Sequence, residues 1–244
     1  MKQENLARLH ALEKDYTPGE DTRRINSGKT FIALVAPYAS GKTVIGDEVV
    51  KLEPRISLIN TTTTRPSKVE DQPGFKTADD GITSSWFLEK AQQGALTNFS
   101  VIPGVDAYGT LPEDFPGEHS IGPFLPSGIE QIKRAGFNSF HAIYILTPSD
   151  LWRQFVIESR QNLDKNRFQK RALESIDSAN YALEHMDDFI FLENNTKGAE
   201  GIHKLARKIC DIALNNTVDG SVSPTDAQIY LNGIKEVAKE LAER

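Results

Sequence analysis

Short apolar runs alternate along this chain with longer segments in which apolar residues return every three or four positions. The runs TFIALVA (30–36), FHAIYIL (140–146) and FIFLEN (189–194) are typical of strands buried on both faces of a sheet, and residues 56–59 form a shorter one. The periodic segments between them are typical of amphipathic helices. Strands that alternate with helices predict an α/β fold, a three-layer sandwich around a mostly parallel central sheet.

Both ends of the chain carry helical patterns outside this alternation. Leu6, Leu9 and Leu12 recur among polar neighbours and predict an N-terminal helix. We predict three parts: an N-terminal helical appendage over 1–27, a central domain over 28–214, and a linker with a C-terminal helix over 215–244. Each terminal helix is expected to pack on its own domain or to help form a homodimer.

Composition and charge narrow the classes of protein to consider. The 244 residues are 39% apolar and 25% charged, as in ordinary soluble domains. A formal charge of −6 does not favour a nucleic-acid surface, and no apolar run reaches the roughly 18 to 20 residues of a membrane span. The single cysteine, Cys210, suits a reducing compartment. We expect a soluble cytoplasmic protein, a monomer or homodimer, without nucleic-acid or membrane partners.

The segment Ala36-Pro37-Tyr38-Ala39-Ser40-Gly41-Lys42-Thr43 follows a buried strand and opens a helix, which is the setting of a Walker A phosphate loop. In such a loop backbone N–H groups wrap a phosphate, the lysine neutralises charge and the hydroxyl binds magnesium. We therefore predict a P-loop NTPase fold in which these eight residues bind ATP and Thr43 binds Mg²⁺. Ala36 replaces the first glycine of the motif, which is tolerable only if its backbone avoids positive φ. The tetrapeptide Ser-Gly-Lys-Thr also occurs at 27–30. There it precedes the strand instead of following it, so we assign it to an ordinary loop.

The polar stretch 60–68 resembles the segment S-x-T-T-R-x-x-R with which guanylate kinases hold the phosphate of their acceptor. Thr61 matches the hydroxyl position, Arg65 the first arginine and Lys68 the second. Two cations and a hydroxyl suit a dianionic phosphate, although lysine lacks the bidentate fork of arginine. The plainer interpretation is a threonine-rich edge strand that ends in a proline turn.

Further segments follow in the order of that family and imply an acceptor-binding lobe at about 60–118. Phe75 lies near the place of an aromatic residue of the lobe. Tyr108-Gly109-Thr110 resembles the family's Tyr-Gly-Ser/Thr motif, in which the tyrosine hydroxyl helps bind the acceptor phosphate and Thr110 would face the acceptor. The alternative for Tyr108 is a core aromatic beside a turn.

The basic residues around 153–172 resemble the family's arginine-bearing lid, whose cations neutralise the phosphoryl oxygens in the transition state. Arg160 and Arg171 are the stronger candidates by position, and the plainer alternative is a solvated helix face. Asn194, after the last strand, stands where the family contacts adenine. The resemblance covers roughly residues 30–210 and implies Lys42, Arg160 and Arg171 as the catalytic residues.

Two positions depart from the family pattern. Asn98 stands where guanylate kinases have a glutamate that reads the guanine, and asparagine offers no anionic acceptor pair for the N–H groups of that base. The stretch SIGPFLP, residues 120–126, contains no acid where the family has aspartates. Mg²⁺ needs only one or two carboxylates besides phosphates and waters, so water-mediated binding stays possible.

The resemblance implies an ATP- and Mg²⁺-dependent phosphotransferase acting on a nucleoside monophosphate, with GMP or dGMP as the first choice of acceptor. Two alternatives remain open: a kinase of a different phosphorylated small molecule, and a degenerate guanylate kinase-like binding module. The departures at Ala36, Asn98 and 120–126 favour the alternatives, whereas Lys42, Thr43 and Arg65 favour the enzyme. ATP binding discriminates between an enzyme and a binding module, because a scaffold need not keep it.

Overall fold

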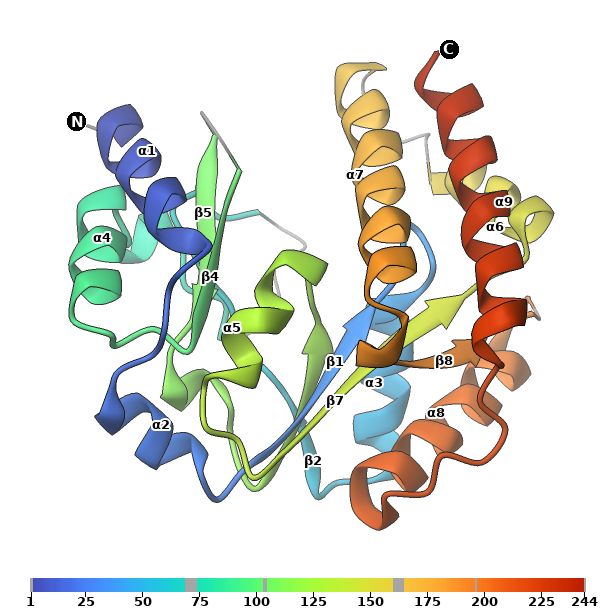
Figure 1. The fold of residues 1–244 in the computed structure, drawn as a ribbon, viewed down its shortest axis with the longest axis horizontal. Coiled ribbons are helices and arrows are strands. Elements are labelled where there is room, and N and C mark those ends of the chain that lie inside the picture. Colours follow the sequence, from blue (N-terminus) through green and yellow to red (C-terminus); the bar gives the residue numbers. More distant parts are fainter. Residues whose placement is uncertain (1, 69–73, 103–104, 160–164, 196, 244) are drawn as a thin grey trace. The chain divides into compact units, whose positions relative to one another are not determined.

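The computed structural model describes residues 2–68, 74–102, 105–159, 165–195 and 197–243 (Figure 1). The chain divides into two compact units. The first unit comprises residues 1–31, 57–120 and 127–140, and the second comprises 32–56, 121–126 and 141–244. The acceptor-matching residues belong to the first unit and the phosphate loop belongs to the second.

The central sheet has five strands in the order β2-β6-β1-β7-β8. Their bounds are β1 Thr30–Val35, β2 Ile56–Leu58, β6 His119–Pro123, β7 Ser139–Leu146 and β8 Phe189–Glu193. β7 and β8 run parallel, with Ala142 opposite Phe189 and Leu146 opposite Glu193. Every residue of β1 is buried, as its apolar sequence predicts. The predicted α/β fold with a mostly parallel sheet is confirmed.

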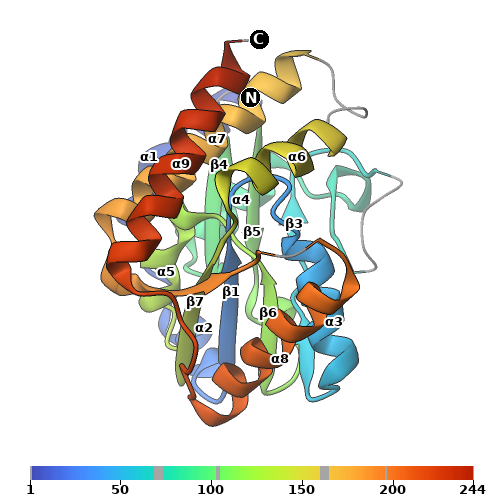
Figure 2. The ribbon, with the colours of Figure 1, turned by 90° about the vertical axis from the view of Figure 1, so that its right-hand side faces the viewer.

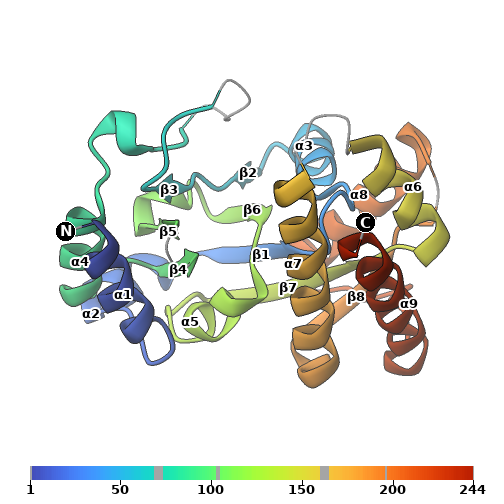
Figure 3. The ribbon, with the colours of Figure 1, turned by 90° about the horizontal axis from the view of Figure 1, so that it is seen from above.

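The helices of the second unit lie on both faces of its strands. α3 (Lys42–Leu52) and α8 (Ala199–Asn215) pack together on one face. α7 (Lys165–Glu184) and α9 (Pro224–Ala242) lie on the other, and α6 (Ser149–Ser159) also contacts α9 (Figures 2 and 3). α9 begins at the N-cap Ser223 and buries one stripe of apolar side chains, as an amphipathic helix does. That stripe consists of Ala227, Leu231, Ile234, Val237, Ala238 and Leu241.

The first unit contains an antiparallel sheet of three strands in the order β3-β5-β4, with β3 Thr62–Thr63, β4 Asn98–Ile102 and β5 Asp106–Thr110. α1 (Lys2–Glu13) packs on α4 (Ser84–Gln92) and on β4. Leu6 and Leu9 of α1 are buried in one apolar cluster with Phe87 and Phe99, whereas Leu12 is exposed. This unit also contains α2 (Glu20–Asn26), α5 (Ile129–Lys133) and short 3₁₀ turns at Ala78–Asp80 and Pro112–Asp114.

Both terminal helices are thus integrated by packing, α1 with α4 and α9 with α7. The domain boundaries at 27/28 and 214/215 stay predictions, because packing contacts do not tell whether a part folds alone. Among the helices of the described residues, none combines the length and the apolar character needed to cross a bilayer.

Candidate phosphate-binding site

The loop between β1 and α3 has two residues in the left-handed backbone region. Gly41, the N-cap of α3, has φ 83, and Ala39 has φ 61. Glycine adopts this region freely, whereas it costs an alanine about 1–2 kcal/mol. The backbone of Ala36, in contrast, is not in this region, so the condition for an alanine at the first motif position is met. The strain of the loop therefore falls on Ala39, a position at which the general motif prescribes no residue type.

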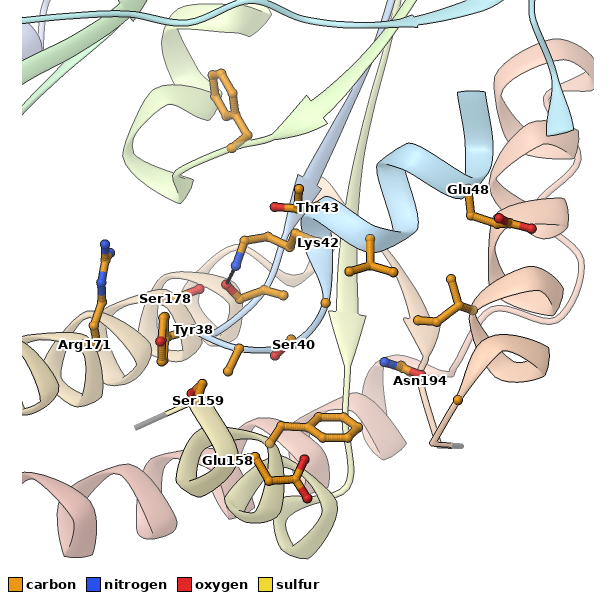
Figure 4. Close-up of a pocket in the computed structure, with 18 of the residues that line it drawn as sticks. Tyr38, Ser40, Lys42, Thr43, Glu48, Glu158, Ser159, Arg171, Ser178 and Asn194 are labelled. Carbon is orange, nitrogen blue, oxygen red and sulfur yellow. Dashed lines mark hydrogen bonds between the residues drawn. The ribbon is translucent and has the colours of Figure 1, made fainter. Parts of the chain in front are cut away.

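Lys42 bends back over the loop that precedes it. Its Nζ donates to the carbonyl oxygens of Ala36 at 2.8 Å and of Pro37 at 2.9 Å (Figure 4). An ammonium group has three protons, so one donor remains for a ligand. Burial and, to a smaller extent, the charge of Arg171 lower the pKa of Lys42 to about 8, with Glu174 partly opposing them. An incoming anion would therefore stabilise the charged form of a lysine, which burial destabilises.

A cavity of about 1310 Å³ opens beside the loop, and all its lining residues belong to the second unit. Two buried oxygens at this cavity have no hydrogen-bond partner: the Oγ of Ser40 and the Oδ1 of Asn194. Leaving a buried polar atom unpaired costs about 1–3 kcal/mol, so such atoms in a cavity wall mark positions for a polar ligand or water. Ser40 belongs to the phosphate loop, and Asn194 follows β8.

Arg171 of α7 lies at one end of the cavity and Asn194 at the other (Figure 4). The guanidinium of Arg171 is 5.6 Å from the centroid of the Tyr38 ring, and it donates to Glu174 over 2.6 Å. Both members of this ion pair are half-exposed, which makes the pair weak and exchangeable. Arg160, the other predicted lid cation, lies outside the described residues.

The end of the cavity near Asn194 combines an apolar wall with one polar atom. Val44, Phe155 and Ile202 line the cavity together with the unpaired amide oxygen of Asn194. Lys197 contacts two of the lining residues: its Nζ donates to Glu158 over 2.8 Å and lies 5.7 Å from the centroid of the Phe155 ring. An apolar slot with a buried acceptor suits a flat heterocycle that carries an amino group.

The donor groups at the cavity suit Mg²⁺ only in a nucleotide complex. Thr43 lines the cavity at the start of α3, and the acid-free stretch reaches it through Phe124, Leu125 and Pro126. Three of the lining carboxylates are bonded elsewhere: Glu48 to His203, Glu158 to Lys197 and Glu174 to Arg171. Within the described residues no cluster of three or more His, Cys, Asp or Glu is placed to hold a metal. The ion would therefore bind through Thr43, phosphate oxygens and waters.

The first unit brings the acceptor-matching residues together in pairs. The guanidinium of Arg65 lies 4.8 Å from the centroid of the Phe75 ring and donates to the carbonyl of Pro66 over 2.7 Å. The hydroxyl of Thr110 donates to the Oδ1 of Asn98 over 2.5 Å, and both residues are buried. Asn98 therefore already uses its amide oxygen inside the protein.

The other predicted acceptor residues are spread along the same unit. Thr61 is half-buried directly before β3, and Lys68 is exposed beyond it. Tyr108 lies in β5 opposite Thr63, and its side chain is half-buried, so it is not a fully enclosed core aromatic. The structure thus places all four candidates, Thr61, Arg65, Lys68 and Tyr108, in the same unit.

Two buried acids near these residues have structural partners. Asp106 accepts hydrogen bonds from Lys2 at 3.0 Å and from Thr64 at 2.9 Å. Asp114, which is fully buried, accepts from Lys76 at 3.0 Å and from the backbone N–H of Leu111 at 2.8 Å. Both carboxylates therefore hold the first unit together.

Comparison with known proteins adds little beyond the fold. No family model matches the chain, and no curated protein matches it. Among solved structures, the guanylate kinase from Anaplasma phagocytophilum is similar, with a TM-score of 0.49 and 13% identity over 79% of this chain and 87% of that one. A likeness at this level says nothing about activity, which has to be inferred from the side chains of the site.

Proposed function

We propose that this chain is an ATP- and Mg²⁺-dependent phosphotransferase that acts on a nucleoside monophosphate. The phosphate loop is the observation that carries the proposal. It joins a buried parallel strand to a helix N-terminus, it has left-handed residues at positions 39 and 41, and its lysine lies over the loop at the edge of a large cavity. A helix N-terminus with free N–H groups and an ammonium is suited to a polyphosphate.

ATP would place its phosphates against residues 36–43 and its adenine between the apolar wall and Asn194. The unpaired Oδ1 of Asn194 suits the exocyclic amino group of adenine, and the unpaired hydroxyl of Ser40 suits a phosphate oxygen. Lys42 would turn its remaining donor to the phosphates. Mg²⁺ bound at Thr43 would neutralise part of the phosphate charge.

Arg171 would serve the transfer step by exchanging partners. Its resting partner Glu174 holds it by a half-exposed ion pair, and such a pair contributes little in free energy. A phosphoryl group carrying spread negative charge can replace that carboxylate. With Lys42 at the start of α3 and Arg171 on α7, the phosphoryl group would be held by two cations from different elements.

The acceptor phosphate would be held by Thr61, Arg65, Lys68 and Tyr108. No general base is needed, because a phosphate oxygen that attacks is already anionic, and positioning with charge neutralisation suffices. GMP or dGMP remains the first acceptor to test. Because the amide oxygen of Asn98 accepts a hydrogen bond from Thr110, this residue would recognise the base differently from the glutamate of guanylate kinases. The single cysteine, half-buried Cys210, is compatible with a cytoplasmic location.

A coupled assay with ATP and Mg²⁺ tests the proposal. The acceptors are GMP, dGMP, AMP, UMP, CMP, dTMP and ribose phosphates, with Lys42→Ala as the disabled variant. The matched control is Lys239→Ala, which removes an exposed lysine on α9. We expect turnover with one acceptor class in the wild type and in Lys239→Ala, and a kcat/KM about 1000-fold lower in Lys42→Ala. Turnover at the wild-type rate in Lys42→Ala would contradict the proposal.

A binding module without transfer activity is the second candidate. The acid-free wall at 124–126 and the internal pairing of Asn98 favour it. Calorimetric titration with ATP and Mg²⁺ separates the two: an enzyme binds ATP with an affinity that Lys42→Ala removes. If no acceptor is phosphorylated and ATP does not bind, the binding module is the better description.

A further inference from the structure

Two helices are hydrogen-bonded to the phosphate loop at a single residue, Tyr38. The indole Nε1 of Trp152, on α6, donates to the carbonyl oxygen of Tyr38 over 2.7 Å. The backbone N–H of Tyr38 donates to the hydroxyl of Ser175, on α7, over 3.2 Å. That hydroxyl in turn donates to the carbonyl oxygen of Arg171 over 2.8 Å, so both of its roles are used.

Trp152 and Ser175, the two partners of Tyr38, are both almost fully buried. Only 1% of the surface of either residue is exposed. A buried donor or acceptor that loses its partner is costly, so these two side chains hold the peptide groups of Tyr38 firmly. The tyrosine ring adds a third attachment through its contact with the guanidinium of Arg171.

The residue that follows Tyr38 is the strained Ala39. A non-glycine residue persists in the left-handed region only where its surroundings impose that conformation. The bonds to Tyr38, together with those from Lys42 to Ala36 and Pro37, fix the chain before Ala39. α3, which begins at Lys42, fixes the chain after it.

We propose that Tyr38 is a positioning residue: through Trp152 and Ser175 it forces Ala39 into the left-handed conformation in which the loop N–H groups are ready for phosphate. The inference rests on the proposed nucleotide binding for its functional readout. It adds that α6 and α7, besides lining the cavity, determine the shape of the phosphate loop. Many loops of this kind can rely on glycine for that shape, whereas this chain uses hydrogen bonds from two helices.

The test is a double-mutant cycle of Trp152→Phe with Ala39→Gly, measured on the affinity for ATP with Mg²⁺. Trp152→Phe keeps an aromatic ring but removes the donor, so in the wild-type background it should weaken ATP binding about tenfold, because a smaller fraction of loops is competent. In the Ala39→Gly background the same substitution should weaken binding only about twofold, because glycine adopts the left-handed region without help. Ser175→Ala should act in the same direction.

Trp86→Phe on α4 of the first unit is the matched control. Its indole is partly buried against an apolar cluster, and the substitution should leave ATP affinity unchanged. Equal losses for Trp152→Phe in both backgrounds would overturn the proposal, since the bond would then only stabilise the fold. Unchanged affinity in Trp152→Phe would overturn it as well.

A second measurement keeps the inference separate from the proposed function. If the wild type itself does not bind ATP, the proposed function fails, and the same cycle is then measured on the free energy of unfolding. Ala39→Gly should stabilise the wild type more than it stabilises Trp152→Phe, because only an intact attachment keeps the alanine strained. Additive effects on unfolding would show that Tyr38 does not impose the conformation of Ala39.

Discussion

The cavity beside the phosphate loop and the acceptor-matching segments differ in how their buried polar groups are paired. At the phosphate loop of the second unit, the Oγ of Ser40 and the Oδ1 of Asn194 are buried and unpaired, and Lys42 uses only carbonyl partners from its own loop. In the first unit, Asn98 is bonded to Thr110, and Asp114 to Lys76. The buried oxygens of Ser40 and Asn194 therefore stay open at the cavity, whereas Asn98 and Asp114 are already hydrogen-bonded within the first unit.

The largest expected effect is on catalysis, and it distinguishes donor binding in the second unit from acceptor binding in the first. Lys42→Ala should lower kcat/KM by about 1000-fold, since it removes a cation from the phosphates in the transition state. Arg65→Ala should instead raise the KM for the acceptor about tenfold and leave the KM for ATP within about twofold. Steady-state kinetics with each substrate varied in turn measure both. Equal effects of Arg65→Ala on both KM values would break the assignment of donor and acceptor to different units.

The second expected effect concerns stability. Asp114→Ala should lower the free energy of unfolding by about 3 kcal/mol, because it leaves Lys76 without its carboxylate and the N–H of Leu111 without its acceptor. Glu113→Ala, an exposed neighbour, is the control and should stay within about 0.5 kcal/mol. Urea unfolding measures both. ATP affinity should persist in the folded Asp114→Ala protein, and its loss would contradict a purely structural role.

The third effect is a pH dependence of stability without nucleotide. The pKa of Lys42 is about 8 in the folded protein and near 10.5 in the unfolded chain. Between these values the unfolded state binds more protons, so the free energy of unfolding should rise with pH. Lys42→Met has no such group. Thermal melts should therefore show the wild type less stable than Lys42→Met at pH 7, with the gap shrinking by pH 10. A gap that stays constant would mean that burial does not destabilise the charged form of Lys42.

The smallest effect tests the strain in the loop. Ala39→Gly should raise the free energy of unfolding by about 1 kcal/mol, because it relieves an alanine at φ 61. Ala36→Gly restores the glycine of the general motif but should cost about 0.5 kcal/mol, since Ala36 has no left-handed backbone to relieve. Denaturant unfolding of the two variants side by side measures the difference. The opposite order would place the strain at the first motif position instead.

The sequence predicted the strands and the phosphate loop because both depend on short-range patterns. Apolar runs of six to eight residues became β1 and β7, and the spacing of Gly41, Lys42 and Thr43 located the cavity. The attachment of Tyr38 could not be predicted in this way. Trp152 and Ser175 lie 114 and 137 positions away from Tyr38 along the chain, and neither belongs to a motif.

The hydrogen-bond partners of the buried acids in the first unit could not be predicted from the sequence for the same reason. Asp106 and Asp114 were visible as acids near the matched segments, but their partners Lys2 and Lys76 lie 104 and 38 positions away. The left-handed backbone of Ala39 gave no signal either, since alanine, unlike glycine or asparagine, does not indicate such a conformation. The fold determines which polar side chains find a hydrogen-bond partner, and short-range sequence patterns do not show it.

The C-terminal helix α9 is coupled to two helices that line the cavity. α9 is joined to α6 by the ion pair of Arg153 with Glu240 at 2.8 Å, and to α7 by a hydrogen bond from Gln169 to the carbonyl of Ala242 at 3.1 Å. None of the described residues of α9 lines the cavity. A nucleotide that contacts α6 and α7 and reduces their motion would therefore also slow amide hydrogen exchange in α9. Exchange in the last turns of α9 would then measure occupancy of a site that α9 does not line.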